Sequence, residues 1–202
     1  IQILPDKLVV HTSIMKTEAS KYADVPAEKI IVTGPPQFDD YYRPLSWSKE
    51  EFFKKLGIPS GRRVALCSPF LDQYTVSAVK IVNTLTEAID DGRLPDDLQI
   101  LLRYRTSTPE IPPELLRKSG HLSFSPKFEI YFPVVVDGVP GRDWEFTNGD
   151  IDILRHILAY SDAVINVDST LSVDAVTFDK PVIDVRFDAV KDCPPRHSIE
   201  RL

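Results

Sequence analysis

Short continuous runs of apolar residues alternate along this chain with segments whose apolar residues recur at helical spacing. The runs at 64–66, 98–102 and 163–167 are typical of strands buried on both faces of a sheet. Between the first two runs, apolar residues repeat every three or four positions from Val76 to Ile89. This alternation predicts an α/β fold, a Rossmann-like parallel sheet with helices on both faces.

The same criteria place the remaining elements. Further strands are predicted at 8–10, 30–32, 129–132 and 181–185, and further helices at 15–23, 49–56, 113–117, 152–160 and 172–178. Residues 104–126 otherwise look irregular, and 133–148 look like a loop. Ser48 and Glu51 have the spacing of a capping box, so the helix after Ser48 has a defined start.

The composition excludes several classes of protein. With 24 Lys and Arg against 30 Asp and Glu, the net charge is −6. Sequence-independent electrostatic binding to nucleic acid is therefore not expected. A hydrophobic content of 43% and a charged content of 27% are typical of a globular protein rather than a disordered one. No apolar run approaches the ~18 residues of a membrane span.

The two cysteines, Cys67 and Cys193, show neither a disulfide framework nor the spacing of a metal site. Cys67 lies inside an apolar run, so we expect a buried free thiol. Both observations favour a reducing compartment, and we expect the protein to be cytoplasmic.

A junction between a predicted strand and a predicted helix carries two hydroxyl side chains, Ser169 and Thr170. The carboxyl ends of parallel strands and the free N–H groups of a following helix suit a phosphate or diphosphate. An ordinary Ser/Thr helix cap explains the spacing equally. Neither the GxxxxGK[ST] loop nor the GxGxxG fingerprint is present, so the common nucleotide motifs do not apply.

Two longer stretches resemble a known family. The first is SDAVINVDSTLSVDA at 161–175, followed by DKPVI at 179–183, and the second is EKIIVTGPPQFD at 28–39. Together, and in this order, they resemble GT-B glycosyltransferases, including CDP-glycerol glycerophosphotransferases and the related UDP-N-acetylglucosamine 2-epimerases. The resemblance extends over roughly residues 8–188 and implies one half of a GT-B fold.

The resemblance implies roles for individual residues. Ser169 and Thr170, with the backbone at Leu171, would bind the donor diphosphate, and Asp174 would bind the ribose hydroxyls. The family usually has Glu in the place of Asp174, which is one methylene shorter. Ser68 could also reach the diphosphate, or it could be a plain turn residue before Pro69.

Basic residues follow the strand predicted at 98–102. The resemblance implies that Arg103 faces the donor phosphates, and a surface salt bridge is the alternative. The Arg-Tyr-Arg-Thr sequence up to Arg105 keeps the family pattern only in part. Lys127 and Phe128 lie where related enzymes contact the base.

Several other signals have simpler explanations. Asp150 and Asp152 form a DxD pair, but they open a predicted helix, where acidic residues favour the helix dipole. The four histidines lack metal-site spacing, and we expect no metal and no cofactor apart from the nucleotide-activated substrate. His156 is predicted to be a packed or surface residue. Core and interface roles both remain open for Trp47 and Trp144.

The resemblance implies a domain organisation and an activity. Residues 1–29 would be the tail end of a preceding N-terminal domain, and 30–202 the donor-binding domain, cut short at its C-terminal end. The activity would be glycosyl-type transfer from a nucleotide sugar or CDP-alcohol to a glycan, lipid or polymer, in polysaccharide biosynthesis. The catalytic base would come from the other domain, so the sequence assigns none.

Alternatives remain at this point. A UDP-sugar 2-epimerase of the same fold and a non-catalytic α/β module that binds a phosphorylated ligand or a protein are both compatible with the sequence. Peripheral attachment to the inner face of the membrane through the other domain, and assembly of several copies, are likewise left open.

Overall fold

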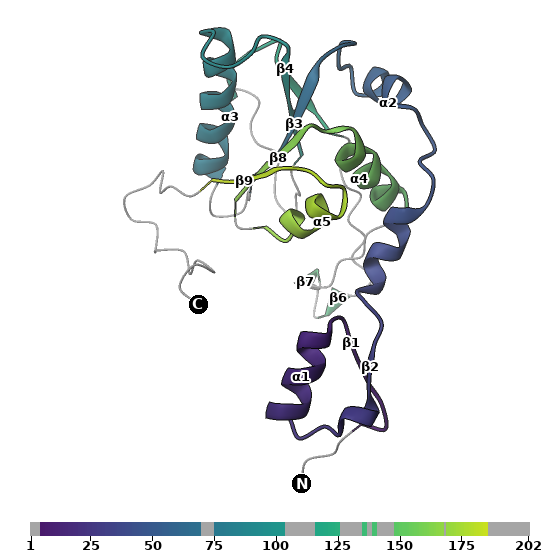
Figure 1. Cartoon of the computed structure of the whole chain (residues 1–202). Helices are drawn as coiled ribbons and strands as arrows, with labels where there is room; N and C mark the ends of the chain where they lie inside the picture. Colours follow the sequence, from purple (N-terminus) through teal and green to yellow (C-terminus); the bar gives the residue numbers. More distant parts are fainter. Residues whose placement is uncertain are drawn as a thin grey trace. The chain divides into compact units, whose positions relative to one another are not determined.

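The computed structural model describes residues 5–69, 75–103, 116–125, 135–136, 139–140, 148–167 and 169–185 (Figure 1). The chain divides into two compact units, Ile1–Pro44 and Leu45–Leu202. No structural observation tests the predicted boundary at residue 29, which stays a prediction. None of the helices in the described ranges has the length and apolarity that a membrane crossing needs.

The smaller unit is a two-stranded parallel sheet with one helix. Strands β1 (Leu8–Val10) and β2 (Ile30–Val32) pair, and helix α1 (Ser13–Tyr22) connects them before the short 3₁₀ turn Ala27–Lys29. Thr12 caps α1 by accepting a hydrogen bond from the N–H of Met15. A second 3₁₀ helix, Pro36–Tyr42, follows. The sequence did not predict it, because the Gly-Pro-Pro run before it indicates a break.

The larger unit is built on a five-stranded parallel sheet in the order β5-β4-β3-β8-β9. Its strands are β3 (Arg63–Ser68), β4 (Leu98–Leu102), β5 (Leu122–Phe124), β8 (Ala163–Asn166) and β9 (Val182–Asp184). Its helices are α2 (Lys49–Lys55), α3 (Thr75–Asp90), α4 (Asn148–Tyr160) and α5 (Leu171–Thr177). The predicted fold class, an α/β Rossmann-like parallel sheet, is confirmed.

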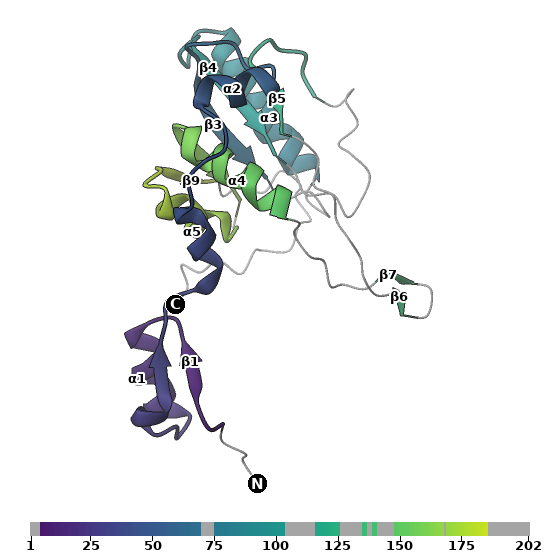
Figure 2. The same cartoon turned by 90° about the vertical axis from the view of Figure 1, so that its right-hand side faces the viewer.

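Helices cover both faces of this sheet (Figures 1 and 2). One core packs α3 against alternate strand residues, among them Cys67, Ile100 and Ile165. The other core packs α2, α4 and α5 against the residues that point the opposite way, such as Leu66 and Val164. The central strands β3, β4 and β8 are therefore buried on both sides, as their continuous apolar runs predicted. The edge strands β5 and β9 are not, since Phe124 and Ile183 are exposed.

Helix α2 begins as the sequence predicts. The Ser48 hydroxyl accepts a hydrogen bond from the Glu51 N–H at 3.2 Å, and the Glu51 carboxylate accepts one from the Ser48 N–H at 2.9 Å. The bond from the Ser48 N–H to the carboxylate, together with the Ser48 hydroxyl beside it, lowers the pKa of Glu51 below its ordinary value. The cap lets Phe52 and Phe53 enter the core on the first turns of the helix.

The structure departs from the predicted elements in the middle of the chain. Strand β5 lies in a region that was predicted to be irregular, and the two-residue strands β6 (Val135–Val136) and β7 (Val139–Pro140) lie in a predicted loop. Three- and two-residue strands carry too little periodicity to be recognised, and they form because a partner strand supplies hydrogen bonds. Leu116 and Arg117 are not helical, and the strand predicted at 129–132 is outside the described residues.

Candidate functional site

A row of polar side chains crosses the carboxyl ends of four neighbouring strands. Ser68 ends β3 and is the register partner of Asn166, which ends β8 and is itself the partner of Asp184 at the end of β9. Arg103 extends β4, since its N–H donates to the Cys67 carbonyl at 2.9 Å. We call Arg103, Ser68, Asn166 and Asp184 the polar row.

The polar row faces the side of the sheet that carries α4 and α5. Side chains alternate along a strand, and the residues two positions earlier, including Leu66, Leu101 and Val164, pack in the core on that side. Arg103 and Asn166 are buried, with 6% and 1% of their surface exposed, and Ser68 and Asp184 are half-buried. Polar side chains thus replace apolar ones where the strands end.

The centre of the row is the point where the strand order reverses. From β3 the chain proceeds outward through β4 to β5, and it then returns to β8 on the other side of β3 before adding β9. In parallel α/β sheets, ligands bind just beyond the carboxyl ends of the strands at such a reversal. Here that place lies beyond the ends of the neighbouring strands β3 and β8 (Figure 1), where Ser68 and Asn166 are register partners.

The predicted phosphate-binding junction follows β8. The Ser169 hydroxyl accepts a hydrogen bond from the Leu171 N–H at 3.2 Å, and the Ser169 carbonyl accepts one from the Ser172 N–H at 3.1 Å. The N-cap residue of α5 is Thr170, and Ser169, one residue earlier, supplies the capping hydrogen bond, as the alternative interpretation allowed. Thr170 is exposed, and its side chain makes no capping bond. Phosphate binding by these residues stays a prediction.

The other predicted site residues fall in two groups. The structure brings Arg103 and Ser68 together on neighbouring strand ends, and it places Asp174 in the first turn of α5, half-buried. Arg105, Lys127, Phe128, Trp144 and Cys193 lie outside the described residues. The ribose-binding role of Asp174 stays a prediction.

Asn166 and Asp184 were missed by the sequence analysis. The Asn166 Nδ2 donates to the Ser172 Oγ at 2.9 Å, while its Oδ1 is buried and has no hydrogen-bond partner. The available signal was that the apolar runs of β8 and β9 each end in a polar residue, Asn166 and Asp184, at an equivalent position. Only the register between the strands shows that these positions are neighbours.

The DxD pair has a structural role in this geometry. Asp150 lies in the first turn of α4. The Asp152 carboxylate accepts hydrogen bonds from the Ser46 hydroxyl and the Arg155 guanidinium, both at 2.9 Å. The bond from Ser46 holds the segment before α2 against α4, and the bond from Arg155 lies within α4. Among the described residues, no group of three or more His, Cys, Asp or Glu side chains is arranged to hold a metal ion.

His156 is a packed residue, one of the two alternatives left open for it. Its ring is fully buried, with its centroid 4.8 Å from that of Trp47 and 5.1 Å from that of Phe52. Trp47 thus belongs to the core, one of the two roles left open for it. The Tyr160 hydroxyl donates to the Trp47 carbonyl at 2.6 Å, and burial raises the pKa of that phenol.

Cys67 is a buried free thiol, as predicted. It lies in the middle of the sheet, one residue before the polar row, with 1% of its surface exposed. Desolvation raises the pKa of the thiol from 9.0 to about 12. A thiol with so little thiolate at neutral pH is a poor nucleophile.

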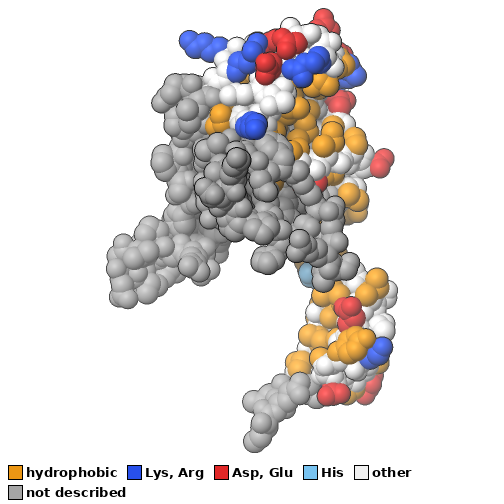
Figure 3. Space-filling view, turned by 90° about the vertical axis from the view of Figure 1, so that its left-hand side faces the viewer, with side chains coloured by type: hydrophobic (Ala, Val, Ile, Leu, Met, Phe, Trp, Pro, Cys, Tyr) orange, Lys and Arg blue, Asp and Glu red, His pale blue; other side chains and the backbone are white. Residues whose placement is uncertain are grey.

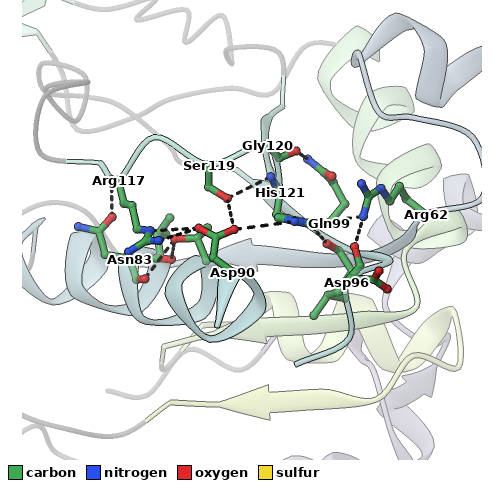
Figure 4. A network of polar contacts seen from close by, with 12 residues as sticks. Arg62, Asn83, Asp90, Asp96, Gln99, Arg117, Ser119, Gly120 and His121 are labelled. Carbon is green, nitrogen blue, oxygen red and sulfur yellow. Dashed lines mark hydrogen bonds and ion pairs between the residues drawn. The ribbon is translucent and has the colours of Figure 1, made fainter. Parts of the chain in front are cut away.

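A second polar cluster occupies the opposite, amino-terminal ends of the strands (Figure 4). Asp90 at the end of α3 accepts hydrogen bonds from Arg117, at 2.9 Å, and from Ser119, at 3.3 Å. His121 contacts the Leu98 carbonyl at 3.0 Å, and its Nε2 lies 3.8 Å from Asp90. Acidic and basic side chains are mixed at this end of the unit (Figure 3). The cluster attaches the segment before β5 to α3.

The chain matches no protein-family model and no curated protein. Among solved structures, it resembles Staphylococcus aureus MnaA in complex with UDP, with a TM-score of 0.57 and 14% identity over 90% of this chain. It also resembles the UDP-GlcNAc 2-epimerase of Neisseria meningitidis bound to UDP-GlcNAc, with a TM-score of 0.52 and 12% identity over 85% of this chain. The chain spans 42% of the length of each.

A further match is the wall teichoic acid polymerase TagF, with a TM-score of 0.49 and 18% identity over 88% of this chain and 38% of that protein. At identities this low, similarity of structure concerns the fold. The fold agrees with the predicted GT-B superfamily, and the chain has the Rossmann-like α/β fold of one half of a GT-B protein.

Proposed function

We propose that this chain is the donor-binding half of a GT-B-type glycosyltransferase. It would take a nucleotide sugar or CDP-glycerol as donor and serve transfer to a glycan, lipid or polymer acceptor. The observation that carries the proposal is the polar row, which lies at the reversal of strand order in a Rossmann-like sheet. The ligands named for two similar structures, UDP and UDP-GlcNAc, support a nucleoside diphosphate.

The chemistry needs stabilisation of the departing nucleotide phosphate. Arg103 supplies a positive charge at the strand ends, and the hydroxyls of Ser68 and Thr170 supply donors. These groups are fixed by the sheet and by α5, so little reorganisation is needed when the leaving group gains charge. The acceptor also needs a general base, which we assign to the other domain of the full protein.

The proposal also covers the cellular setting. The enzyme would act in the cytoplasm, in polysaccharide biosynthesis. Attachment to the inner face of the membrane through the other domain and assembly of several copies stay predictions. Asp174 is proposed to bind the ribose of the donor.

An epimerase of the same fold is the second candidate, because the similar structure from Neisseria meningitidis, with a TM-score of 0.52, is a UDP-GlcNAc 2-epimerase. The full protein incubated with UDP-GlcNAc distinguishes the two. An epimerase inverts C2 of the sugar without an acceptor, whereas a transferase releases UDP and joins the sugar to one.

Thermal-shift titration with UDP, CDP, GDP, dTDP and ADP tests the proposed site, first without metal and then with magnesium. We expect one nucleotide to raise the unfolding midpoint, because a ligand at a hundred times its Kd adds about 2.7 kcal/mol of stability. The double variant Ser169→Ala/Thr170→Val should lose this shift.

The matched control is Ser60→Ala/Thr84→Val, which removes two exposed hydroxyl side chains away from the polar row and should keep the shift. If no nucleotide shifts the folded chain or the full protein, the non-catalytic module replaces the proposal. If both double variants keep the shift, the donor site lies elsewhere.

A further inference from the structure

Asn166 is the most buried member of the polar row and has an unsatisfied hydrogen-bonding atom. Its Nδ2 donates to the Ser172 Oγ at 2.9 Å, which fixes the orientation of the amide. Its Oδ1 is buried and accepts no hydrogen bond. Unsatisfied buried polar atoms are rare in native proteins, and each calls for an explanation. At the end of a central strand, an absent ligand is such an explanation.

The position of Asn166 distinguishes it from two comparable side chains. The Gln99 Oε1 and the Ser161 Oγ are also buried without a hydrogen-bond partner. Gln99 is the second residue of β4, and Ser161 precedes β8, so both lie toward the amino-terminal ends of the strands. Asn166 instead lies at the carboxyl end of β8, next to Ser68 at the reversal of strand order.

The chemistry of the free atom selects the group that it can bind. An amide oxygen only accepts hydrogen bonds, and phosphate oxygens are acceptors as well, so the two repel each other. A ligand hydroxyl donates and fits. Within the polar row, the cation Arg103 lies on β4, two strands away from Asn166 on β8, with Ser68 between them.

We infer that Asn166 accepts a hydrogen bond from a hydroxyl group of the bound donor, which lies along the polar row with its phosphates toward Arg103. This inference rests on the proposed function and adds an orientation for the ligand. Asn166 is then a binding residue that favours nucleotides, which carry hydroxyls, over inorganic pyrophosphate, which has no sugar hydroxyl. Ser172 is a positioning residue that orients the amide.

The test compares the five nucleoside diphosphates named above with inorganic pyrophosphate, using calorimetric titration of the folded chain. Asn166→Leu removes the acceptor, and Asn166→Ser replaces the amide oxygen with a hydroxyl on a shorter side chain that does not reach the same place. Using two variants guards against one that fails to fold. Both should weaken nucleotide binding about tenfold and leave pyrophosphate binding within about twofold. Asn166→Asp keeps an acceptor and should stay within about threefold of the original nucleotide affinity.

Gln99→Leu is the matched control, because it removes a buried amide of the same kind from the other end of the sheet; its nucleotide affinity should not change. Unchanged nucleotide affinity in Asn166→Leu and Asn166→Ser overturns the inference and leaves the proposed function intact. Equal losses for nucleotide and pyrophosphate, or an equal loss in Gln99→Leu, also overturn it. If neither the chain nor the full protein binds any of the nucleotides, both the inference and the proposed function are refuted.

Discussion

At the scale of single residues, His156 is a polar side chain that packs in the core and takes no part in the proposed site. The backbone N–H of Trp47 donates a hydrogen bond to the His156 Nε2 at 3.1 Å, so this nitrogen carries no proton. The Nδ1 then carries the proton and donates to the Asp152 carbonyl at 2.7 Å. Both ring nitrogens therefore have a hydrogen-bond partner. The ring joins the segment before α2 to α4 without facing the polar row.

Cys67 gives a prediction at the same scale. Burial raises its pKa from 9.0 to about 12, so the folded state favours the neutral thiol. This contribution to stability is present below pH 9 and is lost as the pH rises, because the unfolded chain ionises first. At pH 10 the loss should be about 1.4 kcal/mol. Urea unfolding at pH 8 and pH 10 measures it.

The control for that experiment is Cys67→Ala, which has no thiol to ionise at this position. Its free energy of unfolding should fall less between the two pH values than that of the original chain. Equal slopes for the two proteins would show that Cys67 does not remain protonated in the folded state.

At the scale of elements, the capping bonds and the proposed site lie at the ends of helices and strands rather than in their middles. Helix α2 is short and starts at a capping box, α5 starts at the Ser169 cap, and β3 and β8 end in the polar row. The middles of the central strands β3, β4 and β8 are apolar and buried on both faces, so polar side chains at the proposed site come from the strand ends. The proposed site follows from this arrangement.

Removing the cap of α2 should destabilise the larger unit. In Ser48→Ala the Glu51 N–H loses its acceptor, and the first turn that carries Phe52 and Phe53 is weakened. The expected loss in the free energy of unfolding is about 1 kcal/mol, measured in urea. Ser60→Ala, at an exposed turn, is the control and should be neutral. A neutral Ser48→Ala would contradict a stabilising cap.

At the scale of the whole molecule, the two units differ in how much core they contain. The larger unit holds both extensive core clusters. In the smaller one, the buried core cluster consists of Val10, Val25 and Ile30. A two-stranded sheet with so small a core is marginal on its own.

We therefore expect different behaviour when the two units are produced separately. Residues 45–202 should unfold cooperatively on heating, whereas a peptide of residues 1–44 should show little structure by far-UV circular dichroism. Loss of cooperative unfolding in 45–202 would show that the larger unit depends on the smaller. A well-folded 1–44 peptide would show that its three-residue core suffices.

The sequence by itself determined the features that depend on local order along the chain. Apolar runs and helical spacing predicted β3, β4, β8, α3 and α4, the capping box predicted the start of α2, and the run around Cys67 predicted its burial. Local periodicity suffices there because a residue's burial follows the repeat of its own element. The resemblance to GT-B proteins likewise depended on motifs in consecutive residues.

Only the tertiary structure decided which distant residues become neighbours. Strand β5 has three residues and forms because β4 offers it a parallel edge, with Ile100 beside Leu122. Ser68 and Asn166 are far apart in the sequence, and they meet because β3 and β8 pair in one register. Burial of the apolar residues on the proper face fixes that register once two strands are paired, but the sequence of one strand does not say which strand will be its partner.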